Sequence, residues 1–330
     1  MDLSGSAFAW AAAAAAAATA VLLFATTSGW LYYFLVGRHK LEPGKRCVVV
    51  TGCDSGFGLD MALDLTEKGF LVVALCYTKQ GAARLKQQKQ AGLVVVLGDV
   101  TKSSDIDQLL RATVALLKKH KTARLWAVVN NAGVAPMGQV AWVPEDTVRH
   151  CMDVNFFAVY NVVRAYLPLL KDSPGSRIIN ISSMAGLAGG PSFGPYCASK
   201  HALQGLTTCL REELRPWDVS VCNVNPAFMR TPMLGASIDQ ARRLFEAADE
   251  SVRSQYDEAA VLADGNKVLL IAESPSLVVR LVVDRLIPSR APLFNNYVGL
   301  QAGLLRLVLV LPKLWIEIGI SLVAPRFRKA

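Results

Sequence analysis

The chain has 330 residues, of which 52% are hydrophobic, so it is long and apolar enough to bury the core of one large α/β domain. Its formal net charge is +9, but the basic residues are not gathered in one block. That distribution argues against nucleic acid as a partner and favours a membrane surface. The seven cysteines include no Cys-x-x-Cys pair, so we expect buried free thiols, a reducing compartment and no metal site.

The N-terminal segment predicts a membrane anchor. Residues 3–37 contain no charged side chain, and a helix through them exceeds the roughly 20 residues that span a bilayer. A cleaved signal peptide is the alternative, but the segment begins with Asp2 and has no basic residue there. Basic residues follow closely, from Arg38 to Arg46, which predicts a cytosolic catalytic domain. We expect residues 1–42 to be anchor and linker and residues 43–330 the catalytic domain.

Residues 46–58 read RCVVVTGCDSGFG, which predicts a strand, a glycine-rich turn and a helix. Glycines stand at Gly52, Gly56 and Gly58, and the helix is expected over residues 59–68. Such a turn aims backbone N–H groups and a helix N-terminus at an anion, as in dinucleotide-binding folds. The alternative is an ordinary strand-to-helix turn, since the spacing is not the common G-x-G-x-x-G.

The end of the second predicted strand, residues 69–75, bears on the choice of cofactor. Dinucleotide folds that use NAD commonly carry an acid there, whereas a basic residue favours NADP. This chain has Cys76 and Tyr77 instead, and its glycine turn contains Asp54 and Ser55 but no arginine or lysine. Because Asp54 would repel an extra phosphate, we expect NAD, with NADP as the alternative.

Further strands are expected at residues 93–97 and 125–129, with an amphipathic helix over residues 105–119 between them. The second of these strands is followed by Asn130-Asn131-Ala132-Gly133, whose small residues let the backbone approach a cofactor. One long helix is expected over residues 144–170.

A serine, a tyrosine and a lysine follow the strand expected at residues 178–181. They are Ser183, Tyr196 and Lys200, and a helix that begins near Pro195 places the last two on one face. An ammonium beside a phenol lowers the pKa of the tyrosine, so that it can exchange a proton with an alcohol or ketone. Taken alone, the pair equally describes a surface helix with a half-buried tyrosine.

The C-terminal third predicts a strand at residues 219–224, a helix over 277–286 and a last strand within 292–298. Between them, residues 227–263 are rich in charge and helix formers and are expected to form a substrate lid. The tail, about residues 297–330, is apolar but interrupted by charges and by Pro312, so it is too broken to span a bilayer. We expect it to lie on the membrane or to roof the substrate pocket; ordinary core packing is the alternative.

Taken in order, these motifs resemble the short-chain dehydrogenase/reductase superfamily over residues 45–232. TGCDSGFG, VNFF and the N-terminal apolar segment resemble its retinol/hydroxysteroid dehydrogenase branch, which includes 11-beta-hydroxysteroid dehydrogenase type 2 and 3-hydroxybutyrate dehydrogenase. The resemblance implies a doubly wound parallel sheet, the Rossmann fold, behind an N-terminal transmembrane helix. It also implies localisation to the endoplasmic reticulum membrane and a homodimer.

The resemblance assigns roles to individual residues. The catalytic group would be Asn155, Ser183, Tyr196 and Lys200. Asn155 would help hold a water near the lysine, and its alternative is a packing hydrogen bond. Asp99 would contact adenine or, equally, cap a helix. Ala227 replaces a common glycine, which puts the geometry of that loop in doubt. The cofactor would be held by Gly52, Asp54, Ser55, Gly56, Phe57, Gly58, Asp99, Asn131, Ala132, Gly133, Tyr196, Lys200, Pro226 and Thr231.

The function expected from these features is hydride transfer between a nicotinamide cofactor and a hydrophobic alcohol or ketone, such as a retinoid or hydroxysteroid. A membrane anchor beside an apolar tail suggests a substrate that partitions into lipid. One alternative is a small hydroxy acid, which would need a cation such as Arg230, Arg242 or Arg243 for its carboxylate. A non-catalytic dinucleotide-binding membrane scaffold is the other.

Overall fold

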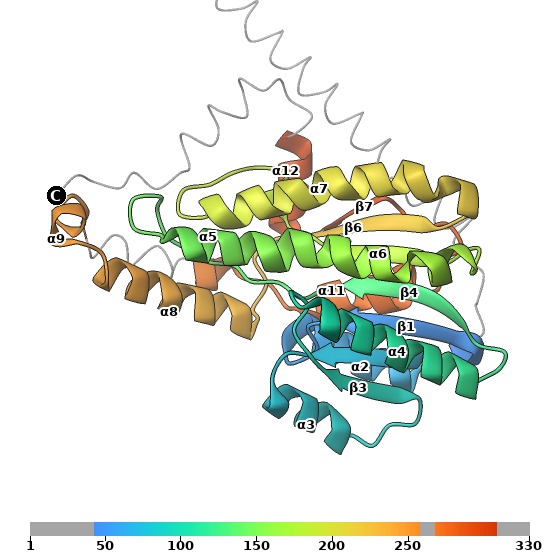
Figure 1. Cartoon of the computed structure of the whole chain (residues 1–330). Helices are drawn as coiled ribbons and strands as arrows, with labels where there is room; N and C mark the ends of the chain where they lie inside the picture. The colour runs from blue at the N-terminus through green and yellow to red at the C-terminus, as the bar shows by residue number, and fades with distance from the viewer. Residues whose placement is uncertain (1–42, 258–267, 309–330) are drawn as a thin grey trace, which may run out of the picture.

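The computed structural model describes residues 43–257 and 268–308, and within them a seven-stranded sheet organises the fold (Figure 1). Every pair of neighbouring strands is parallel, in the order β3-β2-β1-β4-β5-β6-β7. The predicted doubly wound parallel sheet is therefore confirmed. The strands are β1 (Arg46–Thr51), β2 (Leu71–Cys76), β3 (Leu93–Leu97), β4 (Arg124–Asn130), β5 (Arg177–Ile181), β6 (Ser220–Pro226) and β7 (Asn295–Val298).

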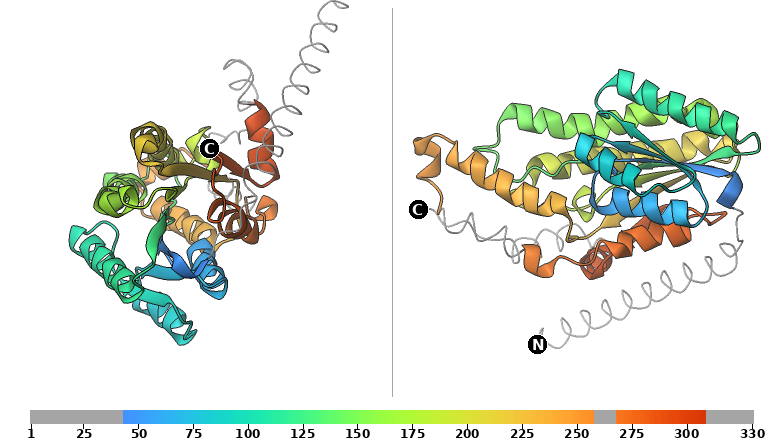
Figure 2. Two further views of the ribbon diagram at one scale, coloured as in Figure 1. Left: turned by 90° about the vertical axis from the view of Figure 1, so that its right-hand side faces the viewer. Right: turned by 90° about the horizontal axis from the view of Figure 1, so that it is seen from below.

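Helices cover both faces of the sheet, which Figure 2 shows edge-on in its left view. One layer contains α2 (Gly56–Glu67), α3 (Lys79–Gln87), α11 (Ser276–Arg280) and the π-helical η5 (Leu281–Leu286). The other contains α4 (Ser103–Lys119), α6 (Ala158–Lys171) and α7 (Gly194–Leu214). The remaining elements are η1 (Pro43–Lys45), α5 (Glu145–Met152), η2 (Asp153–Phe157), η3 (Met184–Gly186), η4 (Arg215–Trp217), α8 (Pro232–Glu246), α9 (Glu250–Arg253) and α12 (Leu300–Val308).

The central strands are mostly apolar because both of their faces are covered by helices. All six residues of β2 are buried, as are the last five of β1. Valine is frequent in these strands, and its branched side chain fits a pleated, packed surface. This is why short, continuous apolar runs located the first six strands to within two residues, while the last, expected from residue 292, begins at Asn295.

The predicted long helix over residues 144–170 is interrupted in the structure. It consists of α5, the π-helical turn η2 and α6, joined end to end. The π turn contains Asn155, whose side chain bonds outside its own helix, as described below. Sequence periodicity did not reveal this turn, because one widened turn leaves the apolar face of the helix nearly unchanged.

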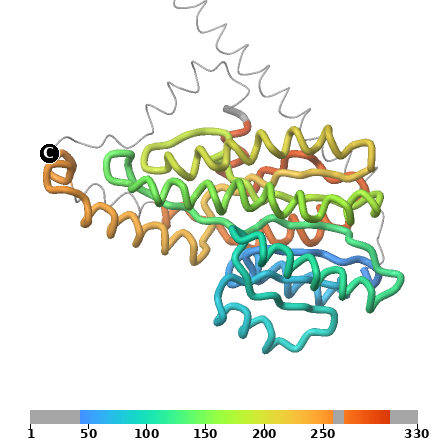
Figure 3. The backbone as a smooth tube through the Cα atoms, viewed as in Figure 1, coloured from blue at the N-terminus to red at the C-terminus, as the bar shows by residue number. Residues whose placement is uncertain are grey.

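The fold places a crevice at the carboxyl ends of the strands. The order of the strands reverses at β1, which pairs with both β2 and β4. Ligands of such sheets bind in the crevice beside this reversal. Helix α8 and the start of α5 extend beyond these strand ends, on the left of Figure 3. The substrate lid was predicted at this position.

Among residues 43–257 and 268–308, no helix is both long and apolar enough to cross a bilayer. The predicted N-terminal transmembrane helix lies outside the described residues, as does most of the apolar tail. All seven cysteines are free, and only Cys209 is exposed, which agrees with the expectation of buried thiols.

Candidate active site

One cavity of about 1180 Å³ lies at the carboxyl edge of the sheet. Residues directly after six strands line it: Gly52, Tyr77, Gly98, Asn131, Ser182 and Ala227. Of the residues predicted for catalysis or cofactor binding, all except Gly58 and Asn155 are among the described residues that line it. Motifs spread over nearly 180 residues of sequence thus meet in one chamber.

The glycine turn leaves no room for side chains. Gly52 has a φ of +70°, and a Cβ there would lie 2.7 Å from Cα of Ala132. A Cβ on Gly58 would lie 2.2 Å from the carbonyl oxygen of Gly52. Asn131 braces the same turn, because its Nδ2 donates to the carbonyl oxygens of Thr51 and Gly52 at 2.9 and 3.0 Å. The result is bare backbone and the N-terminus of α2 facing the cavity, which suits a pyrophosphate.

Asp54 is fixed between the glycine turn and the end of β2. Its carboxylate accepts hydrogen bonds from the backbone N–H groups of Tyr77 and Thr78, at 2.8 and 2.7 Å. It also accepts one from Oγ1 of Thr78, at 2.6 Å. In folds that use NAD, an acid commonly ends the second strand. Here the glycine turn supplies a negative charge at that place, through Asp54.

Asp99 faces the cavity but does not cap the following helix. It lines the cavity, and its Oδ1 accepts from both N and Oγ1 of Thr101, at 2.9 and 2.8 Å. It therefore closes the turn that precedes α4 rather than capping the helix, whose N-cap is Lys102.

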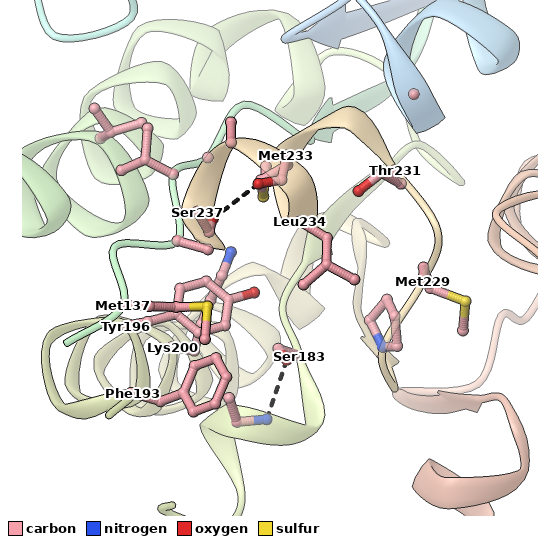
Figure 4. A pocket seen from close by; sticks show the side chains of 18 of the residues that line it. Met137, Ser183, Phe193, Tyr196, Lys200, Met229, Thr231, Met233, Leu234 and Ser237 are labelled. Carbon is pink, nitrogen blue, oxygen red and sulfur yellow. Dashed lines mark hydrogen bonds between the residues drawn. The ribbon is translucent and has the colours of Figure 1, made fainter. Parts of the chain in front are cut away.

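The reacting end of the cavity is built by α7 and the end of β5 (Figure 4). Tyr196 and Lys200 lie one turn apart on α7, and the Lys200 ammonium is 5.7 Å from the centre of the Tyr196 ring. Nζ of Lys200 donates to the carbonyl oxygen of Ile181 at 2.9 Å. The Ser183 hydroxyl begins η3 by accepting from the N–H of Ala185 at 3.1 Å. All three side chains face the same space.

The acid–base balance at this end differs from the expectation of a tyrosine tuned toward neutrality. Burial raises the pKa of Tyr196 to about 12, although its hydrogen bond with Ser183 works in the opposite direction. Burial likewise lowers the pKa of Lys200 to about 8. Desolvation disfavours both charged forms and is the largest cause of both shifts.

Asn155 is buried beside this group rather than at the cavity surface. Its Oδ1 accepts from the N–H of Val134 at 2.9 Å, and its Nδ2 donates to the Val134 carbonyl at 2.8 Å and to Oγ of Ser199 at 2.9 Å. Its amide therefore joins the loop after β4 to helix α7. A Cβ on Gly133 would lie 3.2 Å from the Asn155 Oδ1, so a larger residue there would press on Asn155.

The remaining predicted positions follow the cofactor side of the cavity. Ser55 is the N-cap of α2 and Thr231 the N-cap of α8, while Pro226 ends β6. Ala227 does not have a positive φ, so the replacement of glycine causes no backbone strain there.

Sequence reasoning did not identify the apolar wall of the cavity. This wall includes Met137, Trp142, Phe193, Met233, Leu234 and Ile271. Trp142 also makes edge-on ring contacts to Phe245, at 5.1 Å between centroids, and to Tyr256, at 4.6 Å. These contacts hold α8 against the loop before α5. A tryptophan in a loop was the available signal, but its partners lie about 100 residues away in sequence.

A family model for short chain dehydrogenase matches residues 46–242. The chain belongs to the short-chain dehydrogenase family. The predicted resemblance is confirmed, as is the enzyme class, a family of NAD(P)-dependent alcohol dehydrogenases and reductases.

Known short-chain dehydrogenases are about one third identical to the chain. Human short-chain dehydrogenase/reductase family 9C member 7 is 33% identical over 267 residues, 79% of this chain and 84% of that protein. Bovine mitochondrial D-beta-hydroxybutyrate dehydrogenase is 34% identical over 227 residues, 66% and 65% of the two chains, so the match spans just under two thirds of it. Mouse retinol dehydrogenase 5 is 34% identical over 232 residues, 69% and 71%.

Solved structures agree on the fold. A short-chain dehydrogenase/reductase from Burkholderia phymatum in complex with NAD has a TM-score of 0.68 at 24% identity, covering 87% of this chain and all of that one. A short-chain dehydrogenase from Burkholderia cenocepacia in complex with NADP has a TM-score of 0.63 at 23% identity, over 86% and 98% of the chains. The family thus uses nicotinamide cofactors of both kinds, and the bare glycine turn fits such a group.

Proposed function

We propose that this short-chain dehydrogenase is a membrane-anchored enzyme that transfers a hydride between NAD and a hydrophobic alcohol or ketone, such as a retinoid or hydroxysteroid. One observation carries the proposal: the hydroxyls of Ser183 and Tyr196 face a large chamber whose other wall is built of aromatic and aliphatic side chains. A chamber lined in this way favours an apolar substrate body by removing it from water.

The polar groups of the site would act on the oxygen of that substrate. In oxidation, Ser183 and Tyr196 bind the hydroxyl, and the Tyr196 phenolate takes its proton at Oη. Lys200 supports the charged phenolate and holds the ribose hydroxyls of the cofactor. The bound nicotinamide supplies the hydride acceptor or donor. Asn155 would support this group by fixing the loop after β4 against α7, since its amide bonds Val134 and Ser199.

NAD is favoured over NADP by the charge at the end of β2. The Asp54 carboxylate is held there by three hydrogen bonds, and the backbone that it contacts belongs to Tyr77 and Thr78. A ribose hydroxyl can donate to a carboxylate, whereas a 2′-phosphate would be repelled by it. The relatives named for retinol and hydroxybutyrate are dehydrogenases, which agrees with oxidation of an alcohol.

The wider arrangement belongs to the same proposal. Residues 1–42 would anchor the enzyme in the endoplasmic reticulum membrane with the catalytic domain, residues 43–330, in the cytosol. Residues 227–263 would form the lid. A homodimer would pair through the helices of Asn155 and Tyr196, where Phe157 of η2 and Tyr160 of α6 are about half exposed at 51% and 48%. Light scattering of the detergent-solubilised protein tests the dimer.

The deciding experiment is turnover by the detergent-solubilised full chain, followed by the absorbance of the reduced cofactor. NAD and NADP are tested separately against all-trans-retinol, a panel of hydroxysteroids and 3-hydroxybutyrate, with Tyr196→Phe as the matched control. Turnover of a lipid alcohol that disappears in Tyr196→Phe is the expected result. Absence of turnover with every alcohol and ketone, despite cofactor binding, would contradict the proposal.

A small hydroxy acid is a second candidate, because one cation lines the cavity on the lid side. Of the three arginines considered for a carboxylate, Arg242 is the one among the described lining residues, and Arg230 instead donates to the carbonyl oxygen of Ala272 at 3.2 Å. The candidate predicts turnover of 3-hydroxybutyrate that Arg242→Leu reduces at least about tenfold through KM. Turnover of lipid alcohols that Arg242→Leu leaves unchanged would exclude it.

A further inference from the structure

Four asparagines stand in register across neighbouring strands. Asn130 of β4 is paired with Asn180 of β5, Asn180 with Asn223 of β6, and Asn223 with Asn295 of β7. Hydrogen bonds join the side chains of the first and last pairs. Asn130 Nδ2 donates to Asn180 Oδ1 at 2.8 Å, and Asn223 Nδ2 donates to Asn295 Oδ1 at 3.4 Å. The first three are buried, so this asparagine ladder is a polar row inside an otherwise apolar layer.

Helix α7 reaches the asparagine ladder and the strand ends through Gln204. Its Oε1 accepts from Nδ2 of Asn223 at 2.6 Å. Its Nε2 donates to Oδ1 of Asn225 at 2.5 Å and to Oγ of Ser182 at 3.2 Å. One carboxamide therefore ties α7 to the end of β5 and to two positions of β6. Removing one such hydrogen bond lowers the stability of the fold, because a buried polar group is left without that partner.

Gln204 contacts the chain both before and after Ser183, and it lies close to Lys200. It follows Lys200 by one helical turn, so the two share a face of α7. Ser182, which it bonds, precedes Ser183. Gly186, three residues after Ser183, is packed so closely that a Cβ there would lie 3.0 Å from Cγ of Gln204 and 2.8 Å from the carbonyl oxygen of Lys200. The serine turn and α7 are thus in direct contact at this residue.

We propose that Gln204 is a positioning residue that fixes α7 against β5 and β6, and thereby sets the placement of Tyr196 and Lys200 relative to Ser183. The proposal rests on the proposed function in that these three groups are taken as the reacting ones. Gln204 does not line the cavity formed by the described residues, so it acts through them and not on the substrate. A displacement of about 1 Å between reacting groups is enough to cost roughly 100-fold in rate.

The test compares two substitutions on the same helix in the full-length enzyme. Gln204→Met keeps the length of the side chain and its packing on Gly186 but removes all three hydrogen bonds. Thr207→Val is the control on the same helix: Thr207 is buried where Gln204 is partly buried, and its Oγ1 accepts from Nδ2 of Asn180 at 2.9 Å, within β5 rather than beyond its end. Both variants take one hydrogen-bond partner from a buried asparagine, so both should lower the melting temperature.

We expect only Gln204→Met to alter the chemistry. Its kcat should fall at least about tenfold, with KM for the cofactor changed less than about twofold and a shifted pH profile. Thr207→Val should keep the wild-type kcat within about twofold and the same pH profile. If Gln204→Met fails to fold, Gln204→Glu replaces it. Its ionised carboxylate still accepts from Asn223 but cannot donate, so activity relative to wild type should recover as the carboxyl is protonated at lower pH.

A second measurement does not depend on turnover. The reactivity of Lys200 toward acetic anhydride, followed by mass spectrometry against pH, should show an inflection near about 8 in the wild type. In Gln204→Met it should move toward the ordinary lysine value of about 10.4 as Lys200 gains water. Unchanged kcat, pH profile and labelling, or equal changes in Thr207→Val, would overturn the proposal. If Lys200 labelling differs between wild type and Gln204→Met but the wild type shows no turnover, the result contradicts the proposed function and not the positioning role of Gln204.

Discussion

The ammonium of Lys200 lies 5.7 Å from the centre of the Tyr196 ring, and the hydrogen bond that it donates goes to the carbonyl oxygen of Ile181 at 2.9 Å. The lysine is thus fixed to the end of β5 and faces the phenol across a gap. Both groups are desolvated, which raises the pKa of Tyr196 to about 12 and lowers that of Lys200 to about 8. Near neutral pH the Tyr196 phenol is therefore neutral, while Lys200 remains mostly an ammonium.

The pH dependence of turnover should reflect the protonation of Tyr196. Oxidation needs the phenolate, and burial has raised the pKa of this phenol, so kcat/KM for oxidation should rise with pH above neutrality. Reduction needs the phenol and should stay level over the same range. Tyr196→Phe should lose at least about 100-fold of activity in both directions. An oxidation rate that falls as pH rises would contradict the assignment of Tyr196 as the base.

Lys200→Met should make the protein more stable and the enzyme inactive. Burial lowers the pKa of Lys200 to about 8, below the unfolded value of about 10.4. Between these values the unfolded chain binds more protons, so wild-type stability should rise with pH there, and below them the cost of the buried charge is fully present. Thermal unfolding at pH 7 should show a midpoint raised by about 2 °C or more, without the rise above pH 8.

Lys68→Met is the control for that experiment, since Lys68 forms a half-exposed ion pair with Asp284 at 3.1 Å. Its removal should change the free energy of unfolding by less than about 1 kcal/mol. A lower midpoint in Lys200→Met than in wild type would show that the buried ammonium stabilises the fold.

Asp54→Asn should weaken the preference for NAD. The amide oxygen still accepts a hydrogen bond from the turn after β2, but the negative charge is gone, so the repulsion of a 2′-phosphate is removed. The ratio of kcat/KM for NAD to that for NADP should fall roughly tenfold or more. Asp99→Asn is the control, because Asp99 lines the same cavity but is held by Thr101, and it should keep the wild-type ratio. Equal ratios for Asp54→Asn and wild type would refute the role of the charge.

Arg177→Met should destabilise the fold severely. The Arg177 guanidinium is fully buried and donates to the carbonyl oxygens of Gly175, Leu286 and Ile287, at 2.6, 2.6 and 2.9 Å, and to that of Ser289. It also stacks 4.0 Å from the Trp126 ring. Loss of these bonds leaves buried carbonyls unpaired at the end of η5, and should lower the free energy of unfolding by about 3 kcal/mol or more in a denaturant titration.

Arg46→Met is the matched control for Arg177, because Arg46 stacks on the same tryptophan at 4.0 Å. Arg46 is only half-buried, so its loss should cost about 1 kcal/mol. Similar losses in the two variants would mean that stacking on Trp126, and not the bonds to the carbonyl oxygens, is what Arg177 contributes.

The strands and the cofactor turn were predictable because their signals are local. A short valine-rich run is buried on both faces wherever it occurs in such a sheet, and the glycines of the turn are required by contacts within a few residues of β1 and β4. Tyr196 and Lys200 were predictable for the same reason, since helix geometry alone places them on one face. The family resemblance then supplied the order of the motifs along the chain.

What sequence reasoning missed depends on contacts between distant segments. The side chain of Asn155, in the π turn, bonds Val134 and Ser199. No pattern in the local sequence shows these bonds. The pKa of Tyr196 was expected to fall because of Lys200, but desolvation, which depends on everything packed around the ring, raises it. Gln204 had a visible signal in its spacing from Lys200, yet its partners on β5 and β6 appear only when the sheet is assembled.

The wall of the cavity also explains why likeness to relatives is a poor guide to what this enzyme consumes. Residues 46–242 match the family model and contain Ser183, Tyr196 and Lys200, but Ile271 and Leu305, which face the same chamber, lie outside that match. Part of the wall that surrounds the substrate therefore lies outside the stretch that defines the family, and can differ between members whose reacting groups are the same. Two dehydrogenases of this family that are alike in their reacting groups need share no substrate.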